Sequence, residues 1–206
     1  LREHEPQRVV SLQRGNLFTK SAVLIQPYLQ ALADLQRWNE LDETLARPAG
    51  LSISSASAAL WRARAASHLQ DTANLRAKQH LDIVYEATGH GREGATAMAA
   101  ATLAEELGLW EVALLFYEGL AKHQPQSRLK MIEKVQEMAV RDRDTNATLS
   151  AARRLLEIRP DNHQYADRAL YLHLLSGDEV ELAIEKIAHT DSTMATRLED
   201  HFIRAL

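Results

Sequence analysis

The chain contains no cysteine, so it forms no disulfide, holds no metal through thiolates and has no cysteine nucleophile. It is also poor in aromatic residues, which make up 5% of the sequence, and it has only eight glycines and five prolines among 206 residues. The hydrophobic residues, 46% of the total, are mostly alanine and leucine. Because alanine and leucine are strong helix formers, this composition favours helices over sheet and argues against disorder.

A second set of absences concerns charge and long apolar runs. The net charge of −4 and the pI near 6.2 provide no basic stripe that could displace counterions from phosphates, so nucleic-acid binding is disfavoured. No apolar run approaches the roughly 18 residues that span a bilayer, and the N-terminus lacks a basic-then-apolar signal pattern. We therefore expect a soluble fragment without membrane contact, in a compartment that the composition leaves open.

The start of the chain also departs from that of a complete protein. It begins at Leu1 with no initiator methionine, and we expect an excised piece whose parent protein could be anchored or exported.

The stretch from Ala97 to Pro125 reads as two helices joined by a tight turn. Small residues recur at helical spacing up to Leu107, Gly108 ends the first helix, and a second apolar stripe begins at Trp110. This stretch predicts an antiparallel helix pair.

Other segments repeat this design at a nearly constant interval. The expected turns inside the pairs are marked by Trp38, Thr72, Trp110, Thr145 and Glu179, which are separated by 34, 38, 35 and 34 residues. We expect a lead-in at 1–20 and one helical repeat domain at 21–206, with pairs at 21–48, 52–88, 94–124, 127–159 and 162–190 and a trailing helix at 192–206. Each pair has a face that it cannot bury alone, so neighbouring pairs must stack.

This interval and several residue positions resemble those of the tetratricopeptide repeat family, whose period is about 34 residues. The residues that carry the resemblance are Gly108 and Trp110 at the turn, Ala113 and Tyr117 on the second helix, Pro125 at its close, and the segment Arg153–Asn162, which resembles the junction of two repeats. The segment Asp142–Asp144 departs from the pattern because it replaces the turn glycine. The resemblance implies an all-α fold, an α-solenoid of antiparallel helix pairs wound into a superhelix.

Motifs that would carry chemistry are weak. The segment Gly89–Gly94 has the letters of a dinucleotide-binding loop, but a helix is expected before it in place of the required strand, so we interpret it as a loop between repeats. The nine histidines form no H-x-x-x-H or H-E-x-x-H pattern, and no nucleophile or phosphate-binding motif is present. We expect no catalytic residue, no metal site and no cofactor.

The resemblance implies a groove lined by the first helix of each pair, which binds a protein or peptide. The helical register places nine candidate partner-binding residues there: Arg64, His68, Thr102, Glu105, Glu106, Lys130, Glu133, Glu137 and Arg141. Each of these side chains could equally be part of a solvated helix face. On the expected last helix, Phe202, Ile203 and Leu206 have no partner that the sequence identifies within the chain, so they could form a homo-oligomer contact.

The sequence is compatible with three functions. The first is a non-catalytic protein–protein interaction scaffold with an unknown protein or peptide partner. The second is a ligand- or peptide-sensing regulatory module whose effector lies outside this fragment. The third is an enzyme on an all-helical scaffold, which would need an enclosed polar pocket with perturbed ionisable groups.

Overall fold

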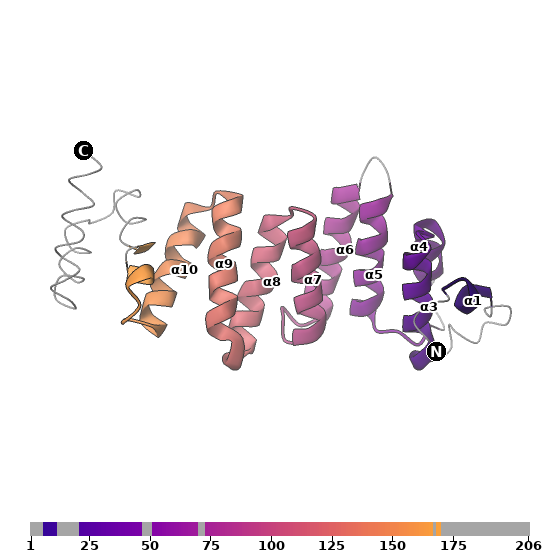
Figure 1. Ribbon diagram of the computed structural model, residues 1–206, viewed down its shortest axis with the longest axis horizontal. Coiled ribbons are helices and arrows are strands. Elements are labelled where there is room, and N and C mark those ends of the chain that lie inside the picture. Colours follow the sequence, from indigo (N-terminus) through magenta and orange to yellow (C-terminus); the bar gives the residue numbers. More distant parts are fainter. Residues whose placement is uncertain (1–5, 12–20, 47–50, 70–72, 167, 170–206) are drawn as a thin grey trace. The chain divides into compact units, whose positions relative to one another are not determined.

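The computed structural model describes residues 6–11, 21–46, 51–69, 73–166 and 168–169, and throughout these ranges its regular structure is helical without a strand (Figure 1). The all-α class predicted from the composition is confirmed. The chain divides into two compact units, Leu1–His123 and Gln124–Leu206, each of which is described by itself. The single repeat domain expected at 21–206 stays a prediction.

In its described ranges, the first unit has a short helix and three antiparallel helix pairs. Its helices are α1 (Pro6–Ser11), α3 (Ala22–Asp34), α4 (Trp38–Ala46), α5 (Ser55–His68), α6 (Ala73–Ala87), α7 (Gly94–Glu106) and α8 (Trp110–His123). Within a pair, α3 contacts α4, α5 contacts α6, and α7 contacts α8. Between pairs, α5 contacts both α4 and α7, while α6 contacts α7 and α8. These contacts form the stack of pairs that the repeat interval predicts, and Figure 1 shows the same order.

The second unit begins with a single 3₁₀ turn, η1 (Pro125–Ser127), followed by α9 (Arg128–Asp142) and α10 (Thr145–Ile158), which pack against each other. Their contact buries apolar residues of both helices: Met131, Ile132, Val135, Met138, Ala139, Leu149, Ala151, Ala152 and Leu155. The Asp144 carboxylate caps α10 by accepting from the Ala147 backbone N–H at 2.9 Å. The chain is helical again at 163–166 and 168–169.

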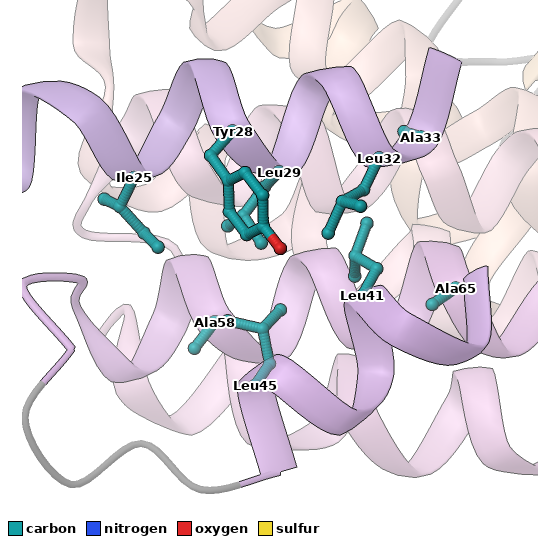
Figure 2. Packing of buried hydrophobic residues seen from close by; sticks show 9 residues of the cluster. All are labelled: Ile25, Tyr28, Leu29, Leu32, Ala33, Leu41, Leu45, Ala58 and Ala65. Atoms are coloured by element: carbon teal, nitrogen blue, oxygen red, sulfur yellow. The ribbon is translucent and has the colours of Figure 1, made fainter. Parts of the chain in front are cut away.

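The core of the first pair shows how the apolar stripes are buried. In Figure 2, Tyr28, Leu29 and Leu32 of α3 point toward Leu41 and Leu45 of α4. All five side chains are at most 2% exposed. Burying a leucine of this kind contributes roughly 1.5–3 kcal/mol, so these contacts hold α4 against α3 although α4 has only nine residues.

Three first helices, α3, α7 and α9, end in the same way. Each is followed by a residue in the left-handed region: Gln36 (φ 57°), Gly108 (φ 69°) and Arg143 (φ 61°). Beyond it, a backbone N–H donates to the carbonyl five residues earlier: Arg37 to Leu32, Leu109 to Ala104, and Asp144 to Ala139. The missing glycine at Asp142–Asp144 therefore leaves the turn geometry unchanged, and Arg143 adopts a conformation that glycine prefers.

The glycine-rich loop Gly89–Gly94 packs onto α8. A Cβ atom added to Gly119 of α8 would lie 2.2 Å from the His90 carbonyl oxygen, and one added to Gly91 would lie 2.8 Å from the Gly119 carbonyl carbon. Helix α6 precedes this loop, so the strand of a dinucleotide-binding motif is absent at this place. The loop lies between two pairs, as the sequence predicts, and its glycines let its backbone approach that of α8 closely.

Side chains about one repeat apart in the sequence contact one another in both units. In the first unit, Trp61 pairs with Gln26, Arg76 with Asp42, and Lys78 with Glu111, at separations of 35, 34 and 33 residues. In the second unit, Tyr165 and Arg168 bind Glu133 and Gln136, in each case 32 residues earlier. Such pairs are what stacked copies of one helix pair produce, because equivalent positions of neighbouring copies lie side by side.

Candidate functional site

A groove of about 530 Å³ opens on the first helices of the three pairs in the first unit. Its lining comes almost entirely from α5 and the α7 helix beside it, with Gln26 from α3 at one end. The lining residues are Gln26, Ser57, Leu60, Trp61, Arg64, Ala95, Thr96, Ala99, Thr102, Leu103 and Glu106. Its volume is in the range of pockets that hold a small molecule or part of a peptide.

One wall of the groove is a fixed arrangement of three polar and aromatic side chains. The Trp61 indole Nε1 donates to Gln26 Oε1 at 3.0 Å, which ties α5 to α3. The Arg64 guanidinium carbon lies 5.9 Å from the centre of a Trp61 ring, within the distance of a cation–π contact. The hydrogen bond and the ring contact together limit the rotamers of Trp61 and Arg64 before any partner arrives.

The opposite side of the groove has small side chains. Ala95 and Ala99, one turn apart on α7, are both exposed, and Thr102 on the following turn is exposed as well. The Thr102 hydroxyl donates to the Met98 carbonyl oxygen at 3.0 Å within its own helix. This side therefore presents short, mostly apolar groups that another chain can approach closely.

Of the five candidate partner-binding residues in the first unit, the structure brings three to the groove: Arg64, Thr102 and Glu106. His68 lies outside it, stacked on Trp38 with ring centres 4.0 Å apart and planes 5° from parallel. Glu105 also lies outside it and accepts a 2.6 Å hydrogen bond from the Tyr117 hydroxyl of α8. Its carboxylate thus joins the two helices of one pair.

The other four candidates lie on α9 of the second unit. Glu133 accepts a hydrogen bond from the Tyr165 hydroxyl. Glu137 forms ion pairs with Lys134 at 3.0 Å and with Arg141 at 2.8 Å. Lys130 is exposed. The partner-binding role of all nine residues stays a prediction, and Phe202, Ile203 and Leu206 lie outside the described residues.

Sequence reasoning missed most of the groove lining, including Trp61, because no motif marked these residues. Trp61 is partly buried against the core of the first pair and also lines the groove. The repeat interval contained a usable signal, since Gln26, Trp61 and Thr96 follow one another at 35-residue steps and all line the groove. The small residues Ala95 and Ala99 carried no signal, because α7 has alanines on both its buried and its exposed faces.

Ionisable groups with shifted pKa values lie away from the groove. Burial lowers the pKa of His80, with a further lowering from Arg62, while Asp42 acts in the opposite direction. The His80 Nδ1 atom is buried without a hydrogen-bond partner. Asp42 is bound by Arg62 at 2.8 Å and by Arg76 at 3.7 Å. This cluster joins α4, α5 and α6 and connects two pairs.

Two of the tyrosines that the structure describes have raised pKa values. The hydrogen bond to Glu133 raises the pKa of Tyr165, and burial raises that of Tyr85, whose ring packs edge-on against Phe116. In the part of the chain that the structure describes, no group of three or more histidine, aspartate or glutamate side chains is placed to hold a metal ion. Among the same residues, no helix is long and apolar enough to cross a membrane.

Comparison with known proteins adds little to this geometry. No family model matches the chain, and no curated protein matches it. Among solved structures, the chain is similar to one described as "MamA RS-1 ArsTM double mutant", with a TM-score of 0.44 and 15% identity over 87% of this chain and 95% of that one. A likeness of this size carries no functional argument. The helix pairs of the first unit stack in order along the chain, while membership of the tetratricopeptide repeat family stays a prediction.

Proposed function

We propose that this chain is a non-catalytic protein-interaction scaffold, and that the groove on α3, α5 and α7 holds a segment of a partner protein. The observation that carries the proposal is the groove itself, which three successive helix pairs build from equivalent positions. Apolar side chains such as Leu60 and Leu103 supply contact area, and a few polar groups supply direction. That combination is the usual composition of a recognition site.

The alternative that this chain is an enzyme requires reactive groups in the groove. Among the described residues, the side chains with shifted pKa values are those of His80, Tyr85 and Tyr165, and none of these lines the groove. The charged groups that do, Arg64 and Glu106, are both exposed. An exposed carboxylate and an exposed guanidinium suit recognition better than proton transfer, which calls for a group held in an apolar pocket.

A regulatory module of a larger protein would use the same groove, with its effector outside these residues. A scaffold and a regulatory module share the binding step, and they differ in whether binding changes the state of an attached effector. An experiment that detects a segment in the groove therefore tests both forms of the proposal.

Photo-crosslinking in cells of the source organism detects such a segment. A photoreactive phenylalanine analogue replaces Thr102, which is exposed at the groove, or Ala87, which is exposed on α6 and does not line it. We expect chains with the analogue at position 102 to crosslink to a defined protein segment. Chains with the analogue at position 87 should not capture that segment. Adding Ala99→Trp, which fills the groove, must abolish the Thr102 crosslink. A crosslink that survives Ala99→Trp, or no crosslink specific to position 102, contradicts the proposal.

A further inference from the structure

Two charged residues line the groove, one positive and one negative. Elsewhere in this unit, Arg62 pairs with Asp42 and Lys78 pairs with Glu111. Within the described residues, Arg64 and Glu106 take part in no ion pair, and the Arg64 guanidinium contacts the Trp61 ring.

These two charges are opposite in sign and lie on different helices, Arg64 on α5 and Glu106 on α7. They do not neutralise each other, since no ion pair joins them. Apart from these two residues, the groove is lined by uncharged groups, among which Leu60, Ala99 and Leu103 are apolar. The groove is thus a short apolar surface with a positive charge on one helix and a negative charge on the other.

We propose that the segment bound in this groove carries an apolar side chain flanked by one acidic and one basic residue, the acidic residue pairing with Arg64 and the basic residue with Glu106. This inference rests on the proposed function and adds the chemistry of the partner. A peptide with two charges of the same sign would form one ion pair with the groove and be repelled by the other groove charge. A peptide with one acidic and one basic residue would form two ion pairs.

For a partner bound in one chain direction, the arrangement also sets the order of its two charges. Because Arg64 is already held over Trp61, pairing with a carboxylate costs little side-chain entropy, and the planar guanidinium can bind both carboxylate oxygens. A partner whose acidic and basic residues are exchanged would meet a like charge at each end. The groove should therefore discriminate a segment from the same segment with its charges swapped.

Display selection with the full chain tests this inference. A library of random 16-residue peptides is selected on the wild-type chain, on Arg64→Glu and on Glu106→Arg, and binders are then retested on Ala99→Trp. We expect groove-dependent wild-type binders to share an apolar residue flanked by one acid and one base in fixed order. Selection on Arg64→Glu should replace the acid with a base and keep the other positions, and selection on Glu106→Arg should replace the base with an acid.

Affinities of a selected peptide give the size of the effect. We expect Arg64→Glu to weaken binding at least about tenfold, which corresponds to roughly 1.4 kcal/mol, and a peptide with its acidic residue changed to lysine to restore binding to that variant. Arg92→Glu and Glu43→Arg make the same charge changes at exposed positions that do not line the groove, and they should leave the affinity unchanged.

The outcomes separate the two proposals. Binders that lose affinity on Ala99→Trp but carry no flanking charges, or that bind Arg64→Glu as well as wild type, overturn this inference and leave the proposed function standing. A library whose binders all ignore Ala99→Trp, or one that yields no binder, counts against both.

Discussion

The Trp61 indole nitrogen donates to the Gln26 side-chain oxygen at 3.0 Å, although the two residues are 35 positions apart in the sequence. They occupy equivalent places on the first helices of neighbouring pairs. The bond therefore links two copies of the repeated unit, and it also forms one end of the groove wall. The same two side chains therefore link neighbouring helix pairs and line the candidate site.

This bond should show as an energetic coupling between the two pairs. Trp61→Phe removes the N–H while keeping an aromatic ring, and Gln26→Leu removes the acceptor. We expect each variant to lower the free energy of unfolding by roughly 0.5–1.5 kcal/mol and the double variant to lose less than the sum, because both remove one hydrogen bond. Urea unfolding of the four chains measures the cycle, and strictly additive losses would show that the bond contributes nothing.

Replacing Gln36 or Arg143 with glycine should stabilise the folded chain. Both residues have φ near 60°, which glycine adopts without the strain of a Cβ atom. We expect Gln36→Gly and Arg143→Gly each to raise the free energy of unfolding by roughly 0.5–1 kcal/mol, and Gly108→Ala to lower it by about 1 kcal/mol. Thermal or urea unfolding provides the measurement. If Arg143→Gly destabilised the chain as Gly108→Ala does, the shared turn geometry would be wrong.

Gly119→Ala should destabilise the chain, against the usual direction for this change inside a helix. Alanine in place of a helical glycine normally adds roughly 0.5–1 kcal/mol of stability. Here the new Cβ would lie 2.2 Å from the His90 carbonyl oxygen, so the Gly89–Gly94 loop must move off α8. We expect a loss on the order of 1–3 kcal/mol in urea unfolding. An unchanged or raised stability would contradict the close approach of this loop.

Stability should fall as the pH drops past the ordinary pKa of histidine, partly through His80. Burial lowers the pKa of His80 in the folded chain below its ordinary value of 6.5, so the unfolded chain binds the proton more tightly. The contribution is therefore fully present above a pH of about 6.5 and is lost as the pH falls toward the folded pKa. We expect wild type to lose more stability than His80→Gln when the pH is lowered from about 7.5 to about 5.5 in urea unfolding.

A histidine on the surface provides the control for this comparison. His90 is exposed, and its Nε2 lies 3.3 Å from Glu86. The His90→Gln chain should keep the part of the pH dependence that His80→Gln removes. Equal pH dependence in wild type and His80→Gln would contradict the role given to burial at His80.

The helix pairs and their interval were readable from the sequence, because burial of one face leaves a periodic pattern and turn residues recur with the repeat. Gly108 marked its turn through its identity, whereas Arg143 makes the same turn without glycine. Such a turn is fixed by backbone hydrogen bonds, which leave no mark on the side-chain pattern.

The candidate site was only partly predictable. The helical register put Arg64, Thr102 and Glu106 on the face where the groove lies, yet it could not show that Tyr117, twelve residues away on the next helix, binds Glu105. Contacts of this kind depend on how two helices are paired. The wall formed by Trp61 depends in the same way on Gln26 of the preceding pair.

The affinity of the partner segment for a chain with a filled groove tests the central claim most directly. The segment identified by crosslinking at Thr102 is titrated calorimetrically into wild type, Ala99→Trp and the matched Ala87→Trp. We predict that Ala99→Trp weakens binding at least about tenfold, roughly 1.4 kcal/mol, while Ala87→Trp binds like wild type. Equal affinity for wild type and Ala99→Trp would contradict the claim that the groove holds the partner.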